Sequence, residues 1–600
     1  MENEEKILDN TQNNFEGIEE HTLTDDDMIN IANSIMQNNN QMIEPKIIDS
    51  NIFNDLEIFN SNDNEQSPIF DRINHTNTYI GSEYLKQILQ NPTDNKDFLI
   101  ERRNNIIKIT NNNQLLQFLS EKLKIIKDLE RDVFWFYDKH EPEVNEWYDN
   151  AYFRNWILKP LNNIKNALNI RTKYLTLISP IIYIISPLIS IIIAYISLRL
   201  MGISVSLFRF LNIARISAQM TPQLLANIGI LPRAIMHLKK LGPYLWFFLY
   251  FQGVYSIVSS ALELNKINKK IHEKVRGVIN YLKETVNLMN ELEKYGFKFS
   301  SKTKIEQFLV NKKVDDYSLI FDQGHYLINF KKISLSQDDI TKVIIDIGNI
   351  DSLFSISKLL LLPHLPFTTA NYIDNNKISC KGMFHPSIGF NNSIKNDINF
   401  DGNVIITGPN GSGKSTIVKG IGLCVLFSHT ITLVNAEYAN IPIFSYINTY
   451  LNIPDCQGKE SLFQAELRRC LYNINRIQSL SPNKKSFLLM DEIFTGTNFK
   501  EGLSAAYSIC KHLTNITNNL TLITTHYKLL TTIEKKFPWP NGYKNFKMVL
   551  NKGNIYTYSL KEGISEVMMA IDMMESYGFP ENVVKDARLI VKKLNKRKYI

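Results

Sequence analysis

Hydrophobic residues recur every three or four positions along much of the first half of the chain, and this spacing predicts amphipathic helices. The clearest examples are SEYLKQIL at 82–89 and NQLLQFLSEKLKIIKDLERDVFWFY at 113–137. Pro92 is expected to end the first of these helices, because the residue before a proline is disfavoured in the helical region. Another long helix, with many charged positions, is predicted at 265–296.

The pattern changes near residue 366. From there onward, short apolar runs alternate with glycine-containing turns and helical segments. This alternation is typical of an α/β domain, in which buried strands and covering helices follow one another along the chain. We therefore expect a helical region followed by an α/β domain at 366–600.

Two uncharged stretches interrupt the helical region. Residues 174–198 form a run of 25 uncharged residues, and residues 241–262 form a run of 22. A helix needs about 20 apolar residues to cross a bilayer core, and aromatic residues, which favour membrane interfaces, stand near the ends of both runs. The pattern favours a membrane-associated helical hairpin over 173–262. The alternative is a hairpin that is buried in protein or forms a self-association surface.

The charge between the two runs conflicts with a simple spanning hairpin. Residues 199–240 hold six Lys and Arg and no acidic residue. Two crossings of the bilayer would place this basic loop on the side opposite a cytosolic α/β domain, although basic loops normally stay on the cytosolic side. A re-entrant hairpin, which keeps the loop and the domain on one side, removes this conflict.

Charge also sets the N-terminal segment apart. Residues 1–72 contain 17 acidic and 3 basic residues and few periodic apolar positions, so we expect 1–75 to be a disordered acidic tail. Since the whole chain carries +7 and this stretch −14, the remainder carries +21, which suits either nucleic acid or anionic lipid. The five cysteines show no metal-ligand spacing and the N-terminus no signal-peptide pattern, so an intracellular protein is expected.

A glycine-rich loop carries the clearest chemistry. VIITGPNGSGKST at 404–416 reads as a strand, a GxxxxGK[ST] loop and the start of a helix. Backbone N–H groups of such a loop bind phosphate, its lysine reaches the β- and γ-phosphates, and the next serine ligates Mg²⁺. We therefore predict a site for ATP and Mg²⁺. The predicted ligands are Gly408, Pro409, Asn410, Gly411, Ser412, Gly413, Lys414, Ser415 and Thr416, with Ser415 also on the metal.

Two further strand ends supply the residues that hydrolysis requires. KKSFLLMDEIF predicts a buried strand ending at Asp491, and LTLITTHY predicts another ending at His526. Asp491 is expected to hold Mg²⁺, Glu492 to polarise the attacking water and His526 to sense the γ-phosphate. Ligands of open parallel sheets bind at the carboxyl ends of strands. Together these pieces predict a Mg²⁺-dependent ATPase.

The sequence around these motifs resembles the MutS family of DNA mismatch repair ATPases. HPSI at 385–388 and KND at 395–397 are similar to that family's elements before the loop. GKESLFQAE at 458–466 resembles its G-x-S-T-F-x-x-E signature after a one-residue insertion, DEIFTGTN at 491–498 its DE-I-G-R-G-T-S loop, and residues 560–594 its closing helices. The LSGGQ-like signature of transporter cassettes does not occur in the sequence.

The resemblance reaches beyond the α/β domain. YIGSEYLKQILQNPTDNKDFLIERRNNI at 79–106 looks like the start of the MutS core domain, and IGNIDSLFSISKLL at 347–360 looks like the helix that ends it. The resemblance implies a long-helix core domain, followed by a MutS-like P-loop ATPase domain. The expected core segments are 76–172 and 263–365, on either side of the apolar hairpin.

The resemblance also implies roles that the spacing of residues does not show. In MutS-like dimers the signature serine of one subunit completes the nucleotide site of the other, so Ser461 is expected to act in trans in a homodimer or a paralogue heterodimer. Tyr558 matches the position of the residue that stacks on adenine. DNA is the implied partner, held by an ATP-dependent clamp related to mismatch repair or recombination.

The chain departs from the family pattern in three places. The family's mismatch reader carries a wedge phenylalanine near a glutamate, but NNFEG at 13–17 lies in the acidic tail, so we do not expect a mismatch reader. The two apolar runs stand where the DNA clamp belongs. Val567, Met568 and Met569 replace the family's S-Y-G, which affects the expected dimer packing. The alternative function is a membrane-bound ABC-type ATPase for remodelling or transport without DNA.

Overall fold

The computed structural model describes most of the chain as two compact units. The described residues are 23–38, 47–61, 67–138, 151–213, 242–310, 323–389, 392–451, 453, 461–537, 542–551, 556–565 and 570–596. The first unit comprises Met1–Ile31, Asp128–Asn287 and Ser300–Val343. The second comprises Ala32–Lys127, Leu288–Phe299 and Ile344–Ile600. NNFEG at 13–17 and the Val567–Met569 substitutions lie outside the described residues.

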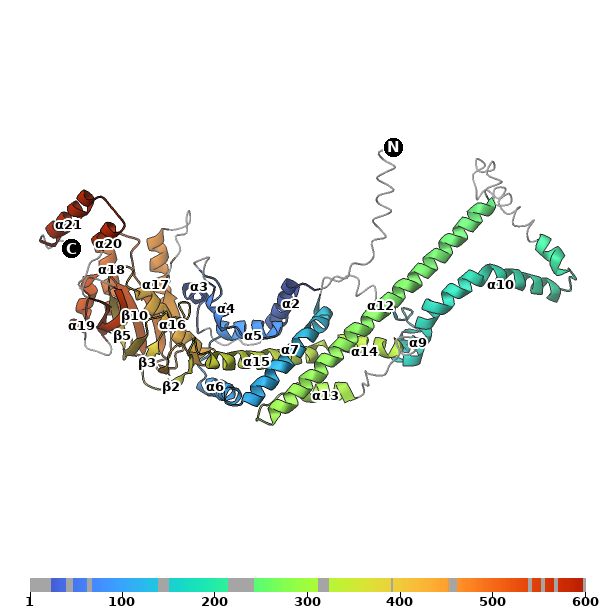
Figure 1. The fold of residues 1–600 in the computed structure, drawn as a ribbon, viewed down its shortest axis with the longest axis horizontal. Coiled ribbons are helices and arrows are strands. Elements are labelled where there is room, and N and C mark those ends of the chain that lie inside the picture. The colour runs from blue at the N-terminus through green and yellow to red at the C-terminus, as the bar shows by residue number, and fades with distance from the viewer. Residues whose placement is uncertain are drawn as a thin grey trace. The chain divides into compact units, whose positions relative to one another are not determined.

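A six-stranded sheet forms the centre of the second unit (Figure 1). Its strand order is β12-β11-β5-β10-β9-β8, and every neighbouring pair is parallel except β11 and β12. All residues of β5, β8 and β10 are buried, as expected for parallel strands covered on both faces. The strands span Asn403–Thr407 (β5), Tyr446–Tyr450 (β8), Ser486–Asp491 (β9), Asn519–Thr525 (β10), Tyr543–Leu550 (β11) and Tyr556–Glu562 (β12).

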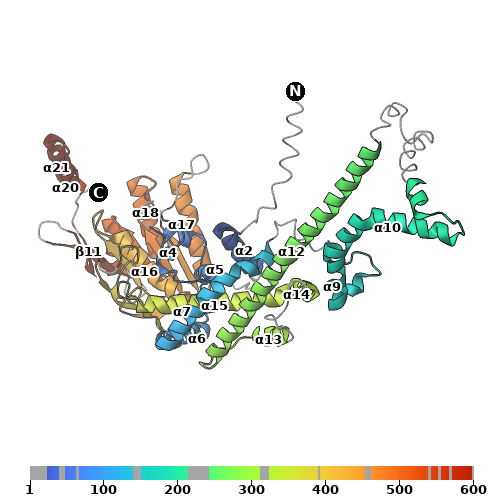
Figure 2. The ribbon, with the colours of Figure 1, turned by 45° about the vertical axis from the view of Figure 1, so that its right-hand side comes forward.

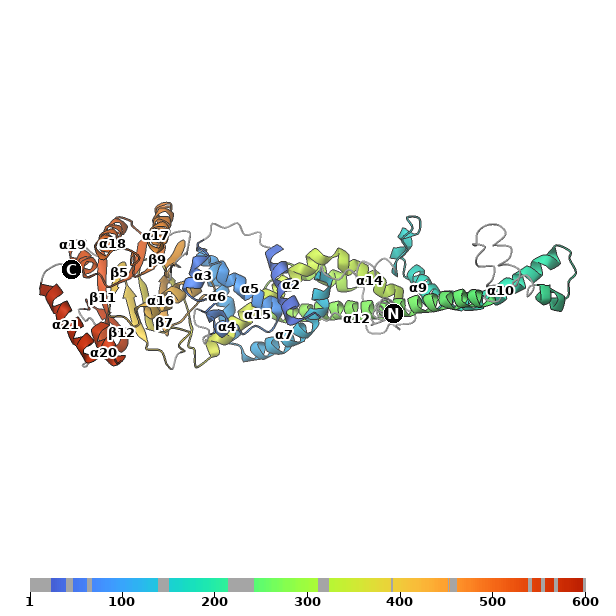
Figure 3. The same ribbon diagram turned by 90° about the horizontal axis from the view of Figure 1, so that it is seen from above.

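Helices follow the parallel strands at the carboxyl edge of this sheet, so the loops between strand and helix gather there. Two closing helices, α20 and α21, follow β12 (Figure 3). The helices are α16 (Lys414–His429), α17 (Leu462–Gln478), α18 (Phe499–Leu513), η5 (Lys528–Thr532), α19 (Ile533–Lys536), α20 (Ala570–Ser576) and α21 (Glu581–Lys596).

Two smaller sheets are formed by strands that come before β5 in the sequence or between β5 and β8. The first has the order β2-β7-β3-β4, and the second pairs β1 with β6. Their first strand begins at Thr368, close to the expected start of the α/β domain at 366. The strands are β1 (Thr368–Thr369), β2 (Asn371–Ile373), β3 (Ile378–Met383), β4 (Asn396–Phe400), β6 (Leu433–Val434) and β7 (Tyr438–Pro442).

The helices predicted before the first apolar run are present. They are α5 (Tyr79–Gln90), α6 (Lys96–Thr110) and α7 (Asn113–Phe134), and α5 ends just before Asn91-Pro92 as predicted. The helix α15 (Gln337–Leu361) supplies the buried Asp351, whose carboxylate accepts hydrogen bonds from the Thr78 N–H and hydroxyl, both at 2.7 Å. A Cβ on Gly81 would lie 2.3 Å from the same carboxylate, so glycine is required there.

The start of α6 is bonded to the α/β domain, which explains why these helices and the sheet belong to one compact unit. The Thr93 N–H donates to the carbonyl of His429 at 3.0 Å, and Arg103 donates to the carbonyl of Ala370 at 2.9 Å. Asp94 accepts from the ammonium group of Lys484 at 2.5 Å. The compact units therefore cut across the expected division into core and ATPase domains.

The expectation of a disordered acidic tail over 1–75 is wrong for the described residues between 23 and 73. This segment forms α2 (Asp25–Asn38), α3 (Asn51–Asp55) and α4 (Ile69–Ile73). Met28, Ile52 and Leu56 are buried in it. The apolar residues are too few and too widely spaced to give a long periodic pattern, so the abundance of Asp and Asn dominated the sequence interpretation.

Three acidic residues of this segment are paired with the α/β domain. Asp55 pairs with Arg469, Glu57 with Lys419 at 2.8 Å, and Asp49 accepts from Asn448 at 2.6 Å. The Ile447 N–H of the outermost strand β8 donates to the carbonyl of Ile47 at 2.9 Å. We call residues 47–61 the acidic strap, because they cover the outer edge of β8.

The apolar hairpin belongs to the first unit and is helical. The segment from residue 165 comprises α9 (Lys165–Lys173), the π-helical turn η3 (Tyr174–Ile178) and α10 (Ser179–Leu200). The second apolar run begins the 52-residue α12 (Gly242–Glu293), which is uninterrupted (Figure 2). The unit also contains η1 (Trp135–Tyr137), η2 (Lys159–Asn163), α13 (Lys302–Val310) and α14 (Gln323–Leu335). Most of the basic stretch 199–240 lies outside the described residues.

Candidate functional site

The glycine-rich loop joins β5 to α16 and has the shape of an anion cradle. Gly411 and Gly413 have φ values of 75° and 90°, a conformation that residues with a Cβ rarely adopt. A Cβ on Gly413 would also lie 3.1 Å from the Tyr558 ring. Because α16 begins at Lys414, the free N–H groups of its first turn stand directly after the loop.

Polar groups in the loop lack the partners that a phosphate would provide. The Ser412 hydroxyl is buried and has no hydrogen-bond partner among the described residues, a state that costs about 1–3 kcal/mol. The Lys414 ammonium donates to the carbonyl oxygens of Gly408 at 3.0 Å and Pro409 at 3.2 Å. Burial lowers the pKa of Lys414, against the effect of the neighbouring carboxylates. The loop therefore fits a phosphate group.

The two predicted metal ligands are in contact. Ser415 Oγ donates to Asp491 Oδ2 at 2.7 Å, and the Thr524 hydroxyl donates to the other carboxylate oxygen. Hydroxyl and carboxylate oxygens suit Mg²⁺, which takes one or two protein carboxylates and completes its shell with phosphates and water. Within the described ranges, no three His, Cys, Asp or Glu side chains cluster as a metal cage. The donor set thus fits Mg²⁺ held jointly with a nucleotide.

Glu492 and His526 form a second pair beside the metal ligands. His526 Nε2 lies 2.6 Å from Glu492 Oε1, and Lys414 Nζ lies 3.6 Å from the same oxygen. The hydrogen bond from His526, aided by the charge of Lys414, lowers the pKa of Glu492. Glu492 also has a φ of 47°, a strained conformation typical of functional sites. The carboxylate is therefore ionised and held beside the lysine.

A cavity of about 570 Å³ opens next to the loop, and Tyr558 lines it together with Asn410 and Thr416. The main chain of Tyr558 is held by Asn396, whose amide donates to the Tyr558 carbonyl at 3.1 Å and accepts from the Leu560 N–H at 2.7 Å. The Tyr558 side chain is half exposed. The structure thus brings the predicted stacking residue to the glycine-rich loop.

His385, the first residue of the HPSI element at 385–388, also lines this cavity. Burial lowers the pKa of His385 to about 4, so the ring is neutral at physiological pH. Ile388 and Asn396 line the cavity too, so the elements at 385–388 and 395–397, which precede the loop in the sequence, contribute to one wall of the cavity.

Ser461 stands apart from the loop of its own chain. It is exposed and caps α17, accepting from the Gln464 N–H at 3.3 Å, and it is not among the described residues that line the cavity. The buried Glu466 of the same helix accepts from the N–H groups of Thr495 at 3.1 Å and Gly496 at 3.2 Å. The signature helix is therefore bonded to the loop that follows Glu492.

Sequence reasoning missed two parts of this site. Thr524 bonds both Asp491 and the Glu492 N–H, and its signal was a polar residue in a buried apolar strand. A second cavity of about 450 Å³ lies beside His526, and Ser565 and Met573 from the closing segment line it. The Ser565 N–H donates to Thr407 Oγ1 at 2.9 Å, which fixes this segment to the end of β5.

Two family models match the chain. The model described as MutS domain V matches residues 404–595, and the model described as MutS domain III matches residues 53–146. The DNA mismatch repair protein MutS of Finegoldia magna is 26% identical over 95% of this chain and 65% of its own length. The protein of the same name from Thermotoga maritima is 29% identical over 41% of this chain and 31% of its own. The MutS protein homolog 4 of Mus musculus is 33% identical over 32% of this chain and 20% of its own.

The fold and the site define an α/β domain with a glycine-rich cradle at the carboxyl ends of its parallel strands. The two matched MutS domains and the one named relative that covers 95% of the chain give the family: the chain belongs to the MutS family. The resemblance stated from the sequence is thus confirmed. The chain spans just under two thirds of the first of these relatives and a third or less of the other two.

Proposed function

We propose that the chain is a Mg²⁺-dependent ATPase that uses ATP binding and hydrolysis to operate a clamp on DNA. The observation that carries the proposal is the meeting of three elements at one sheet edge: Lys414, the Ser415–Asp491 contact and the Glu492–His526 pair. Each is placed at the carboxyl end of a parallel strand, where such sheets bind ligands.

Bound Mg²⁺–ATP supplies the phosphoryl group that is transferred to water. Lys414, which donates to the Gly408 and Pro409 carbonyls, would bind the phosphate oxygens instead, and Ser415 with Asp491 would hold the metal. Glu492 accepts the proton of the attacking water, because the pKa of this carboxyl is lowered and it is ionised. His526 keeps Glu492 in position through their 2.6 Å contact.

Nucleotide titration and turnover assays test these roles. Lys414→Ala is expected to abolish tight ATP binding. Glu492→Gln is expected to bind ATP but to turn over at least about a hundredfold more slowly, the usual scale for loss of a general base. Lys511→Ala, at an exposed position on α18, is the matched control and should change neither. Wild-type affinity in a folded Lys414→Ala variant would refute the site.

The exposed position of Ser461 supports a dimer in which this serine serves the partner's site. Mixing two inactive variants tests the idea. A dimer of Ser461→Ala with Lys414→Ala contains one site with an intact lysine and an intact serine only if the serine acts in trans. Recovery of ATPase activity on mixing supports the dimer; continued inactivity of confirmed mixed dimers contradicts it.

The same proposal includes anchoring of the chain to a membrane by the apolar hairpin. Two helices, Lys165–Leu200 and Phe247–Glu293, are long and apolar enough to cross a bilayer. In their most apolar windows 0% and 11% of the residues are buried. A core helix of this length in a soluble protein is mostly buried instead. The exposure of these apolar side chains therefore supports contact with lipid.

Hydrogen bonds within α10 also suit lipid, where each backbone group needs a partner inside the protein. Pro187 has no N–H, so the carbonyl of Tyr183 loses its helical partner; the Ser186 hydroxyl donates to this carbonyl at 2.7 Å. Tyr250 from α12 donates to the carbonyl of Ile184 at 2.6 Å. A Cβ on Gly253 would lie 2.1 Å from the Tyr183 hydroxyl, so a small residue permits the contact.

Flotation with neutral phosphatidylcholine vesicles tests the anchor. The wild-type chain is expected to float with the vesicles, and Ile185→Glu with Ile192→Glu is expected to stay in the soluble fraction. Alanine at the same two exposed positions is the control for folding and should still float. A wild-type chain that does not float would refute the anchor but not the ATPase. A chain that floats and hydrolyses ATP without binding DNA would favour the alternative of an ABC-type membrane ATPase.

A further inference from the structure

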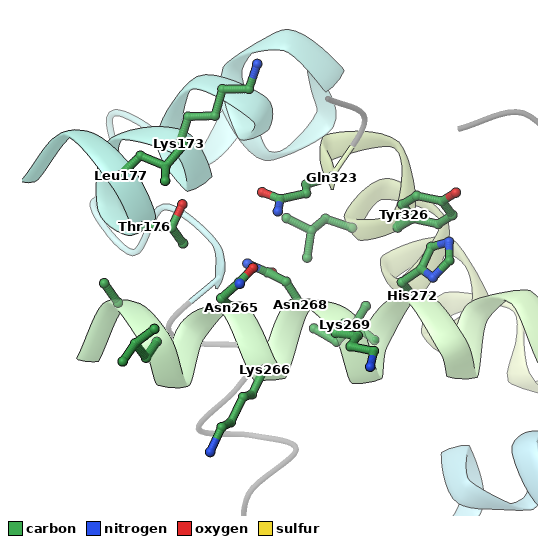
Figure 4. Close-up of a pocket in the computed structure, with 14 residues that line it drawn as sticks. Lys173, Thr176, Leu177, Asn265, Lys266, Asn268, Lys269, His272, Gln323 and Tyr326 are labelled. Atoms are coloured by element: carbon green, nitrogen blue, oxygen red, sulfur yellow. The ribbon is translucent and has the colours of Figure 1, made fainter. Parts of the chain in front are cut away.

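A cavity lies at the foot of the hairpin, where both apolar helices become charged. The apolar run of η3 and α10 begins directly after Lys173, and that of α12 ends directly before Glu263. At this level a space of about 470 Å³ is enclosed by η3, α12 and α14 (Figure 4). If the hairpin enters a bilayer, this level coincides with the lipid headgroups.

The cavity has an apolar side and a polar side, as a phospholipid has apolar acyl chains and a polar headgroup. On the hairpin side its lining consists of Leu177, Ala261 and Leu262, of which the two leucines are exposed beyond the cavity. On the other side it is mostly polar, with Ile271 and Leu327 as its apolar members. The polar lining residues are Thr176, Asn265, Asn268, His272, Gln323 and Tyr326.

Cations surround the cavity, and no carboxylate lines it among the described residues. Lys173, Lys266 and Lys269 line its rim, and the side chains of Lys173 and Lys266 extend outward from it (Figure 4). Lys269 lies 3.9 Å from Glu273 Oε1, with both side chains more than half exposed, so this ion pair is weak. Lysine side chains are long and flexible, so their ammonium groups reach an anion at the rim.

Two buried amides in the cavity have polar atoms without partners. The Asn268 residue is 7% exposed, and its side-chain nitrogen has no hydrogen-bond partner within the described part of the chain. The Gln323 side-chain oxygen is likewise unbonded there. Both side chains extend into the space between the helices (Figure 4). The Asn268 nitrogen can only donate a hydrogen bond, so it fits an acceptor such as a phosphate oxygen. The Gln323 oxygen can only accept one, so it fits a hydroxyl group on the same headgroup.

We propose that this cavity binds the phosphate-containing headgroup of an anionic phospholipid, with the acyl chains lying along Leu177 and Leu262. The inference rests on the proposed membrane anchor and deepens it, because it makes the hairpin selective for lipid charge. A phosphate oxygen accepts from the Asn268 amide, and Lys266 and Lys269 balance its charge. The cavity thus sits where the apolar and polar parts of a lipid meet.

Vesicle flotation with two lipid compositions tests the proposal on the full chain. Vesicles of phosphatidylcholine alone are compared with vesicles that also contain phosphatidylglycerol, an anionic lipid with hydroxyl groups on its headgroup. The wild-type chain is expected to bind the anionic vesicles at least about tenfold more tightly, since several lysines at the cavity rim lie close to the anionic surface. Asn268→Leu and the double variant Lys266→Ala/Lys269→Ala are expected to lose this preference while still floating with neutral vesicles.

The matched control is Lys124→Ala/Lys332→Ala, which removes two exposed charges outside the cavity and should keep the preference. An equal loss in this control, or a wild-type chain with no preference, refutes the headgroup site while the anchor stands. Failure to float with any vesicle refutes the anchor instead.

Two competitors separate the sources of phosphate. Inorganic phosphate at millimolar concentration should not displace the chain from anionic vesicles, because it lacks the acyl chains; displacement would show a site for the free anion. Duplex DNA binding without vesicles should be the same in Asn268→Leu and in the wild type. A DNA-binding loss confined to the cavity variants would overturn the lipid assignment in favour of the nucleic acid backbone.

Discussion

The pair formed by Asp55 of the acidic strap and Arg469 of α17 gives the sharpest test of the structure. Their side chains are 4% and 12% exposed. Asp55 also accepts from the Thr449 hydroxyl at 2.6 Å and from the Leu451 N–H at 3.3 Å. Burial raises the pKa of Asp55 in spite of Arg469. The attraction therefore does not fully offset the cost of removing these charges from water.

This balance predicts an asymmetry between single and double variants. Asp55→Asn leaves Arg469 as a buried charge without its partner, which costs about 3–5 kcal/mol, and we expect the lower end because asparagine still accepts from Thr449. Asp55→Leu/Arg469→Met removes both charges. It should cost only about 1–2 kcal/mol, mainly for the hydrogen bonds lost by Thr449 and Leu451.

The measurement is urea unfolding of the full chain, combined with hydrogen exchange of α17 peptides, because a chain of several units need not unfold in one transition. The expected result is faster exchange of α17 in Asp55→Asn and near wild-type exchange in the double variant. Glu57→Gln is the control: its partner Lys419 is partly exposed, so a cost of at most about 1 kcal/mol is expected. Additive effects of Asp55→Leu and Arg469→Met, without coupling of about 2 kcal/mol or more, would refute the reasoning.

Three further predictions follow from single sites. Tyr558→Ala should weaken ATP binding more than inorganic phosphate binding in titrations, because it removes only the ring beside the cradle; equal losses would contradict stacking. The chain should bind mismatched and matched duplex within about tenfold of each other at about 0.15 M salt, because the acidic strap packs on the sheet instead of forming a separate reading domain. Burial lowers the pKa of His429 to about 4, and its ring accepts from the Phe444 N–H at 2.8 Å, so the unfolded chain binds the proton first. His429 should therefore contribute a loss of about 2 kcal/mol of stability from pH 7 to pH 5, and in pH-dependent urea unfolding the loss in His429→Gln should be smaller by about that amount.

The phosphate cradle was predictable because its chemistry is local in sequence. A glycine-rich loop needs two left-handed glycines and a lysine at fixed spacing, and residues 408–416 carry them in one run. The carboxyl edge of a parallel sheet then brings Asp491 and His526 to the same place, whatever the length of the intervening chain. These constraints predict which strand ends meet, but they determine neither the strand order nor side-chain contacts such as that of Thr524 with Asp491.

The acidic strap was not predictable for the opposite reason. Its stability comes from partners about 400 residues away in the sequence, such as Arg469 for Asp55 and Lys419 for Glu57. The local sequence pattern cannot predict such pairs. Composition describes how a segment behaves alone. In this fold the strap is not alone, because β8 is an edge strand and its outer side accepts a further segment at Ile48.

The strap also links two helices that carry residues of the proposed nucleotide sites. Glu57 holds α16, which begins at Lys414, and Asp55 holds α17, which is capped by Ser461. If Ser461 acts on the partner's site, the short segment Asp55–Glu57 at the end of α3 links the cradle of one site to the signature helix of the other. Asp55→Asn should then slow ATP turnover while leaving nucleotide affinity near wild type, since the cradle of its own site is intact. If Asp55→Asn lowers nucleotide affinity as much as it lowers ATP turnover, the strap supports only the cradle of its own chain. Asp55 would then have no role in coupling the two sites.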